Sequence, residues 1–314
     1  MAENKRFFYG WLILLTCILI MGLGYAPLVS CASLFTKPVT EDLGFTRSGY
    51  ALVSTIAALM MAFMSPFIGK IMSKPYMHKA LVVCMIGNCL AYYCYSFAST
   101  LPQFYVTAAC IGFFECGSTM IPVSVLITNW FRKKRGLVMS IAMVGSSIGG
   151  TILSPIIGNL IASQGWRFTY KAVGITRLVI LVPLVLLVIR RTPADMGTKA
   201  YGADEEGETG KARKTEREWN VSLKEVKKKP MFWCFVLGCT LISATAAVIT
   251  QIPASVMDAG YATTTAASIA SLYLFIAIPG KLVLGHIYDR YGVKAGILFG
   301  NTMFFLSVIC LIFS

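Results

Sequence analysis

The sequence predicts an all-helical integral membrane protein built from two helical bundles, and three observations lead to this fold class. Of its 314 residues, 56% are hydrophobic and only 13% are charged, a composition outside the range of soluble globular proteins. Apolar runs long enough to cross the ~30 Å hydrocarbon core of a membrane recur along the chain. One densely charged segment interrupts them, and part of the pattern before it returns after it.

Nine apolar runs are each long enough to form a transmembrane helix. They cover residues 7–36, 48–69, 80–98, 104–131, 136–163, 168–189, 231–257, 263–287 and 295–314. The first is about twice as long as the core of a secretory signal peptide, so we expect it to be retained as a span.

Residues 191–229 are expected to form a linker between a six-helix bundle at 1–190 and a second bundle at 230–314. The segment is rich in Pro, Gly and charges of both signs, which is typical of a solvated connection. By repetition the second bundle should also contain six spans, yet only three fall within residues 230–314. We therefore expect it to be truncated in this chain.

An internal repeat supports the two bundles. Leu43-Gly44-Phe45 before the second run matches Ala259-Gly260-Tyr261 before the eighth, 216 residues later. Gly69 matches Gly285 at the same offset. A repeat of this length indicates a pseudo-symmetric transporter.

The distribution of basic residues predicts the orientation. If the amino terminus is cytosolic, 22 of the 28 Lys and Arg residues fall on the cytosolic side and four on the outer side. By the positive-inside rule we expect a cytosolic amino terminus and linker, in a protein of the plasma membrane. The basic run Arg132 to Arg135 lies between two apolar runs without interleaved aromatic residues, so we expect it to be a charge cluster of a cytosolic loop. The expected partner of the protein is the lipid bilayer and not nucleic acid.

No metal site, cofactor or enzymatic activity is expected. All ten cysteines fall in apolar runs without a Cys-x-x-Cys pair, and the two histidines, His78 and His286, are far apart in the sequence. No nucleophile and base occur in a recognisable catalytic pattern.

Lys281 is the only charged residue in the run 263–287. Counting eight residues back from Asp289 at the water boundary places it ~12 Å inside the membrane, where a cation costs roughly 3 kcal/mol. Small residues on its helical face, such as Ala277 and Gly285, favour a packed or cavity-lining position. We expect Lys281 to bind an anionic substrate, with a structural charge pair as the alternative.

Glu115 and Arg177 are the two other charges placed within spans. Glu115 is open to three interpretations: a proton-titrating carboxylate, the counter-ion of Arg177 or Lys281, or a purely structural partner. Apolar neighbours surround Arg177 in the sequence, which favours snorkelling or a structural pair over substrate contact.

The fifth run holds several glycines, and two explanations are open. Together with Pro155, the residues Gly145, Gly149, Gly150 and Gly158 are similar to the glycine-proline pattern of antiporters. Close helix packing through small residues explains them without any role in transport, and we favour it.

A motif after the eighth run carries a family resemblance. Gly285, Asp289, Arg290, Gly292 and Lys294 follow the pattern Gly-x-x-x-Asp-Arg-x-Gly-x-Lys, which resembles the loop between the second and third spans of each half in the major facilitator superfamily. The resemblance implies a two-bundle secondary transporter that works by alternating access. It also implies that this loop helps to latch the inward-closed state, with the Asp near a helix amino terminus.

Several stretches are similar to the oxalate/formate antiporter and monocarboxylate transporter-like group of that superfamily. They are Phe35-x-x-Pro38, Gly44-Phe45-Thr46-Arg47, Asn129-Trp130-Phe131, Lys134-Arg135-Gly136, Gly165-Trp166-Arg167 and Arg191-x-Pro193-Ala194-Asp195-Met196-Gly197. The group often has Asn-Gly-x-Gly-Arg-x-x-x-Gly in span eight, and Gly280, Lys281 and Gly285 keep that spacing with Lys in place of Arg. The resemblance implies a mono- or dicarboxylate substrate and a proton or counter-anion as coupling partner.

Lys37 is a second candidate for substrate binding. It resembles the span-one lysine that monocarboxylate transporters use for proton and substrate binding, although a plain interfacial lysine explains it equally well. Ala277 stands where those transporters have an Asp one turn before the span-eight cation.

Two other functions remain open from the sequence. A facilitator for another solute, such as a drug or a sugar, would need no fixed cation in the membrane. A non-transporting membrane fragment would follow from the three missing spans.

Overall fold

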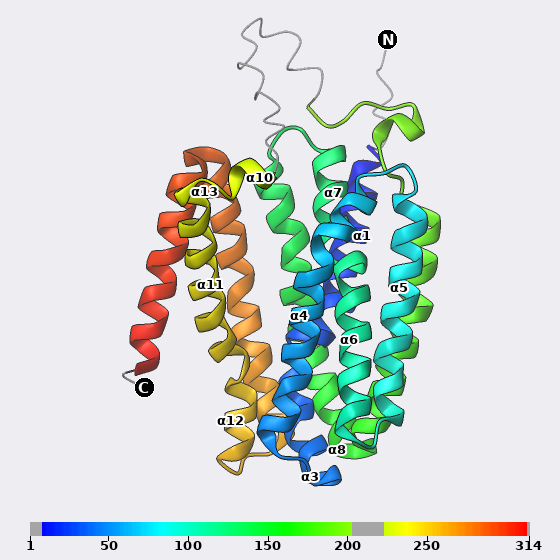
Figure 1. Cartoon of the computed structure of the whole chain (residues 1–314), viewed down its shortest axis with the longest axis vertical. Coiled ribbons are helices and arrows are strands. Elements are labelled where there is room, and N and C mark those ends of the chain that lie inside the picture. The colour runs from blue at the N-terminus through cyan, green and yellow to red at the C-terminus, as the bar shows by residue number, and fades with distance from the viewer. Residues whose placement is uncertain (1–7, 203–222, 313–314) are drawn as a thin grey trace, which may run out of the picture.

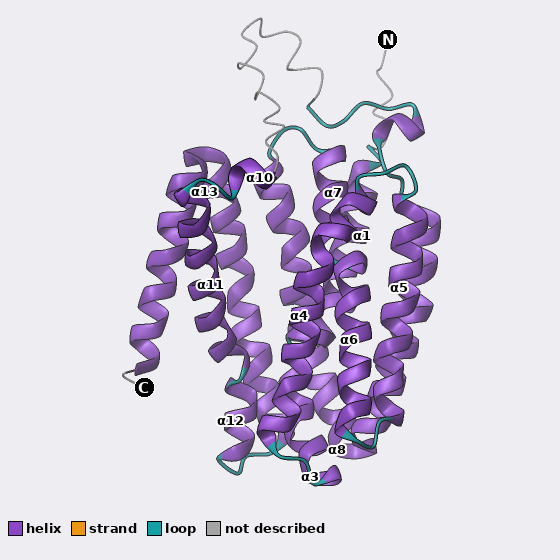
Figure 2. Cartoon of the chain, viewed as in Figure 1, coloured by secondary structure: helices purple, strands orange, loops and turns teal. Residues whose placement is uncertain are grey.

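The computed structural model describes residues 8–202 and 223–312 of the chain. Within these ranges the protein is helical and has no β-strand, with one isolated bridge between Phe131 and Tyr201 (Figure 2). The all-helical class predicted from the composition is confirmed. Residues 203–222, the middle of the expected linker, lie outside the described residues.

The helices follow the apolar runs closely. Those of the first part are α1 (Gly10–Leu19), a π-helical turn (Ile20–Tyr25), α2 (Ala26–Val29), α3 (Thr36–Leu43), α4 (Arg47–Met72), α5 (Met77–Cys94), α6 (Leu101–Ser118), α7 (Met120–Trp130) and α8 (Arg135–Val188). Those of the second part are α10 (Leu223–Val226), α11 (Pro230–Thr250), α12 (Ile252–Asp258) and α13 (Thr263–Ile312). Short 3₁₀ turns occur at Ala32–Phe35, Tyr95–Phe97 and Pro193–Met196.

Local residue chemistry fixes several helix ends. The α3 helix ends at Gly44, whose φ of 66° lies in the left-handed region that glycine adopts without strain. The α4 helix begins after Thr46, whose Oγ1 accepts a hydrogen bond of 3.2 Å from the backbone N–H of Gly49.

The expected count of nine spans is not confirmed. Among the described residues, six segments are long and apolar enough to cross a membrane, judged by length and composition: Gly10–Leu43, Arg47–Met72, Met77–Phe97, Leu101–Trp130, Arg135–Val188 and Thr263–Ser307. The segments α8 and α13 each contain two of the expected runs, separated by one glycine with positive φ, Gly165 at 79° and Gly292 at 83°. The expected run 231–257 corresponds to α11 and α12 and is not among the six segments.

The helices stand side by side in two groups (Figure 1). The larger contains α1 and α4 to α8, and α11 and α13 stand beside it. The two parts of α13 run side by side after the turn at Gly292, which lies at the same end of the molecule as α10. We call this the linker end and the opposite end, where α3 and α12 lie, the α12 end. The domain boundaries at residues 190 and 230 stay a prediction.

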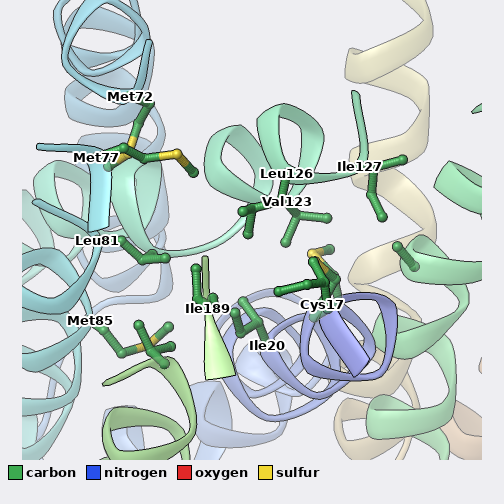
Figure 3. Packing of buried hydrophobic residues seen from close by; sticks show 14 of the residues in the cluster. Cys17, Ile20, Met72, Met77, Leu81, Met85, Val123, Leu126, Ile127 and Ile189 are labelled. Carbon is green, nitrogen blue, oxygen red and sulfur yellow. The ribbon is translucent and has the colours of Figure 1, made fainter. Parts of the chain in front are cut away.

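A buried apolar cluster holds the first bundle together (Figure 3). Residues from α1, the π-helical turn, α4, α5, α7 and the position directly after α8 contribute to it: Cys17, Ile20, Met72, Met77, Leu81, Met85, Val123, Leu126, Ile127 and Ile189. The flexible methionines of this cluster fill irregular gaps between the helices. A second cluster includes Met257, Ala266 and Ala267 together with residues of the first bundle, so α12 and α13 are packed against it.

The glycines of α8 bring neighbouring helices close on two faces. A Cβ atom on Gly149 would collide with the backbone of Gly22, and one on Gly145 with the backbone of Ile18. On another face, a Cβ atom on Gly158 would lie 2.6 Å from the Cβ of Ala267 in α13. Close packing therefore accounts for these glycines.

Candidate functional site

The first part of α8 and the first part of α13 form an antiparallel seam between the two halves of the chain. Ser271 Oγ donates a hydrogen bond of 2.7 Å to the carbonyl oxygen of Thr151. Further along, Gly285 faces Ser140 so closely that a Cβ atom would collide with the serine side chain. Small residues thus allow the two backbones to approach along the whole seam.

Lys281 lies on this seam. Its Nζ donates to Ser146 Oγ at 2.8 Å and to the carbonyl oxygen of Met143 at 3.1 Å, and the residue is half-buried. Both acceptors are neutral. Within residues 8–202 and 223–312, no Asp or Glu forms an ion pair with Lys281. The expectation of a packed, interior lysine is met, whereas the alternative of Glu115 as its counter-ion is wrong.

Glu115 and Arg177 meet through an intermediary inside the first bundle. Arg177 Nη2 donates to Asn88 Oδ1, and Asn88 Nδ2 donates to Glu115 Oε2 at 2.8 Å. Arg177 is 1% exposed, so the snorkelling interpretation is wrong. Its apolar neighbours along the chain misled the prediction, because the side chain passes between helices to polar groups of other spans.

Sequence reasoning missed the partners of these two charges. Besides Asn88, they are Thr119, whose Oγ1 lies 2.9 Å from Glu115 Oε1, and Gly24, whose carbonyl oxygen accepts from Arg177 Nη2 at 2.9 Å. A single amide in the middle of the apolar run 80–98 was the available signal for Asn88. Nothing in the sequence indicates that the backbone carbonyl of Gly24 would accept a hydrogen bond from Arg177.

The loop motif after α13's first part meets the amino terminus of α8. Asp289 Oδ1 accepts from the backbone N–H of Gly136 at 2.9 Å, and Oδ2 accepts from that of Leu137 at 2.7 Å. The first N–H groups of a helix lack partners within the helix and favour a negative charge. A Cβ atom on Gly136 would lie 2.6 Å from Asp289 Oδ1, so a larger residue there would displace the carboxylate from this position.

The other motif residues have different surroundings. Gly292 supplies the positive φ of the turn that follows. Arg290 is exposed, and its Cζ lies 5.5 Å from the ring centroid of Tyr291. Asp289 is therefore the motif side chain that ties the halves together at the linker end.

Lys37 lies at the α12 end and is not brought to Lys281. Its Nζ donates to the carbonyl oxygen of Met257 at 2.7 Å and lies 3.9 Å from Glu41 Oε1. Beside it, Arg47 and Asp258 form a two-pronged ion pair between α4 and α12, which sequence reasoning also missed.

The family model described as Major Facilitator Superfamily matches residues 12–314. Human monocarboxylate transporter 2 is 24% identical over 229 residues, which cover 72% of this chain and 45% of that protein. The MFS-type transporter pytF of Aspergillus terreus (strain NIH 2624 / FGSC A1156) is 26% identical over 209 residues, covering 66% of this chain and 62% of that protein. The chain thus spans less than two thirds of the length of these relatives.

A solved structure has a similar fold. A bacterial homolog of the human lysosomal transporter Spinster, in an inward-facing and unoccupied conformation, superposes with a TM-score of 0.70 at 16% identity. The match covers 92% of this chain and 64% of that one. At this identity the likeness concerns the fold alone.

Proposed function

The chain belongs to the Major Facilitator Superfamily, and from this premise we propose that it moves a small organic anion, a mono- or dicarboxylate, across the membrane by alternating access. The relatives it matches are transporters and not enzymes. The observation that carries the anionic substrate is Lys281, a half-buried cation on the α8–α13 seam whose hydrogen-bond acceptors, Ser146 Oγ and the Met143 carbonyl, are both neutral.

The positive charge of Lys281 attracts an anion, because neither of its hydrogen-bond acceptors carries a negative charge. Hydroxyl and carbonyl oxygens stabilise the ammonium group only in part, and in an environment of low dielectric constant a carboxylate adds a much stronger interaction than it would in water. A substrate bound at the seam would touch both halves of the chain, as alternating access around a fixed site requires.

In this proposal the linker end and the α12 end of the molecule have separate roles. The contact of Asp289 with the amino terminus of α8 latches the linker end. Lys37 ties α3 to α12 through the carbonyl of Met257, and its part in substrate binding stays a prediction. The protein lies in the plasma membrane in this proposal. Its amino terminus and residues 191–229 face the cytosol.

Counterflow in reconstituted vesicles tests the proposal, with labelled formate, lactate, pyruvate and oxalate as probes. Lys281→Gln should lose about tenfold or more in apparent affinity, because a hydrogen bond to a charged group contributes roughly 1.5–3 kcal/mol. Lys281→Arg should retain or tighten binding, since the charge remains and a two-pronged donor becomes available.

Lys79→Gln is the matched control, because it removes an exposed cation of α5 that lies outside the seam and outside the loop motif. Its affinity should equal that of the wild type. An unchanged affinity in well-folded Lys281→Gln protein would reject the carboxylate proposal and favour a facilitator of a neutral solute.

A further inference from the structure

A groove lies between α5 and α6 at the α12 end of the first bundle. The two helices are neighbours and are joined there by a short loop (Figure 1). The groove has a volume of about 410 Å³, and we call it the α5–α6 groove. Its lining comes from the two helices and the segment between them and includes Cys94, Phe97, Ala98, Gln103, Val106 and Thr107. It is therefore separate from the α8–α13 seam.

Large apolar side chains on the walls of the groove are open to the surroundings. Phe97 is 59% exposed and Val106 is 66% exposed. Both belong to segments long and apolar enough to cross a membrane, Met77–Phe97 and Leu101–Trp130. From the start of α6 to Thr107 the chain rises ~9 Å along the helix axis. The groove thus runs from the membrane boundary into the hydrocarbon region, where its apolar walls favour an apolar occupant such as an acyl chain.

Two cations of α8 lie at the end of the groove that is nearest the loop. Lys171 Nζ lies 5.1 Å from the centroid of the Phe97 ring. Arg167 Nη1 donates to the backbone carbonyl oxygens of Ser96 at 3.1 Å and Ala98 at 3.2 Å. Residues four apart on a helix lie on the same face, so both charges can act on one bound group.

These two cations are not neutralised by a carboxylate. Within residues 8–202 and 223–312, no Asp or Glu forms an ion pair with Arg167 or Lys171. The carboxylate of Asp42 instead accepts a hydrogen bond of 3.0 Å from Trp166 Nε1. At the membrane boundary the dielectric constant is lower than in bulk water, so two uncompensated positive charges attract an anionic group strongly.

We infer that the α5–α6 groove binds an anionic phospholipid from the leaflet at the α12 end. Its acyl chain lies along Phe97 and Val106, and its phosphate group is held by Lys171 with Arg167 beside it. Apolar walls alone accept any lipid tail, and cations alone accept any anion. Here the apolar walls lie deeper and the cations lie at the boundary, which is the order of the parts of a phospholipid. This binding does not depend on the proposed function.

Native mass spectrometry of the purified 314-residue protein tests the choice of headgroup. The protein in detergent is titrated with phosphatidylglycerol, phosphatidylcholine or oleate, the two phospholipids having the same acyl chains. The wild type should bind one phosphatidylglycerol more tightly than either other lipid. Lys171→Gln should lose about fivefold of this preference, because one basic residue near an anionic headgroup contributes on this order. Lys171→Arg, and Lys79→Gln at the opposite end of α5, should keep it.

Filling the groove tests the place of the acyl chain. Val106→Trp puts a large side chain on the wall of the groove and should weaken the binding of both phospholipids. Val83→Trp is the matched control, because Val83 is an exposed position of α5 that does not line the groove. Its binding should equal that of the wild type.

The exposed Cys94 reports on occupancy within a membrane. Its reaction with a lipid-soluble maleimide is followed by peptide mass spectrometry, in vesicles of phosphatidylcholine and in vesicles of an equal mixture with phosphatidylglycerol. Cys94 should react more slowly in the mixture. Cys110, which is exposed on α6 but does not line the groove, should react at the same rate in both. Lys171→Gln should remove the difference at Cys94, although the surface charge of the vesicles is unchanged.

Several outcomes would overturn the inference. Equal binding of the two phospholipids by the wild type, or a full preference in folded Lys171→Gln, rejects an anionic headgroup at Lys171. Oleate binding as tight as that of phosphatidylglycerol identifies the occupant as a free fatty acid. Equal slowing at Cys94 and Cys110 shows a general effect of the surrounding lipid. None of these measurements records transport, so each is distinguishable from failure of the Lys281 proposal.

Discussion

Asn88 is the residue on which the buried charges of the first bundle depend. It accepts from Arg177 and donates to Glu115, so a single amide satisfies a cation and a carboxylate at once. Without it, two charged groups would be left in a region with no water to solvate them. Leaving a buried charge uncompensated is among the more destabilising changes in a protein.

We predict that Asn88→Leu lowers the free energy of unfolding by about 3 kcal/mol. The change keeps the side-chain volume similar and removes both hydrogen bonds, so the loss reports on the polar contacts. A thiol-reactive dye that fluoresces as buried cysteines such as Cys17 and Cys89 become exposed on heating measures the effect.

Asn159→Leu is the matched control, since Asn159 is exposed on α8. Its unfolding temperature should equal that of the wild type. If Asn88→Leu were equally neutral, Arg177 and Glu115 would not depend on the amide.

At the scale of the elements, the amino terminus of α8 is the point where the halves are joined at the linker end. Asp289 reaches it because the glycine at 292 turns the chain away immediately afterwards and because Gly136 leaves room for the carboxylate. The contact combines two hydrogen bonds with the favourable field of a helix start.

We predict that Asp289→Ala opens the linker end. Loss of about 1 kcal/mol changes the ratio of closed to open populations about fivefold. Spin labels at Lys74 and Lys294 should show a larger share of long distances in the variant. Glu225→Ala, which removes an exposed carboxylate of α10, should leave the distribution as in the wild type, and an unchanged distribution in Asp289→Ala would contradict the latch.

At the scale of the whole molecule, the two halves are tied at both ends with Lys281 between them. Asp289 provides the tie at the linker end, and the Arg47–Asp258 pair provides it at the α12 end. The α12-end pair is partly exposed, with side-chain exposures of 54% and 31%, so solvent weakens it. Opening at that end should therefore need less energy than its two-pronged geometry suggests.

A charge exchange tests the tie at the α12 end. Arg47→Asp and Asp258→Arg each place like charges opposite one another, and the double exchange restores an attractive pair. We predict that a cysteine at Ala254, a buried position in α12, reacts about two- to fivefold faster with a thiol reagent in each single variant, consistent with up to ~1 kcal/mol for an exposed pair. The double variant should return toward the wild-type rate, and equal rates in all four proteins would show that the pair does not hold this end closed.

Local patterns in the sequence were sufficient for much of this description. The all-helical class follows from apolar runs, because backbone polar groups in a membrane must be satisfied within each helix. The loop from Gly285 to Gly292 and the half-buried, packed position of Lys281 also follow from residues that are close in sequence. For Asp289 the type of partner, a helix amino terminus, was implied by the resemblance to the superfamily.

The partners of the buried charges were decided only by the tertiary structure. Asn88, Thr119 and the carbonyl of Gly24 come from three different elements, and their meeting with Arg177 depends on how the helices are rotated and packed. Hydropathy records which residues avoid water, but it carries no information on which helix faces which. The sequence therefore determined that these charges lie in the membrane, and the packing of distant segments determined what each of them contacts.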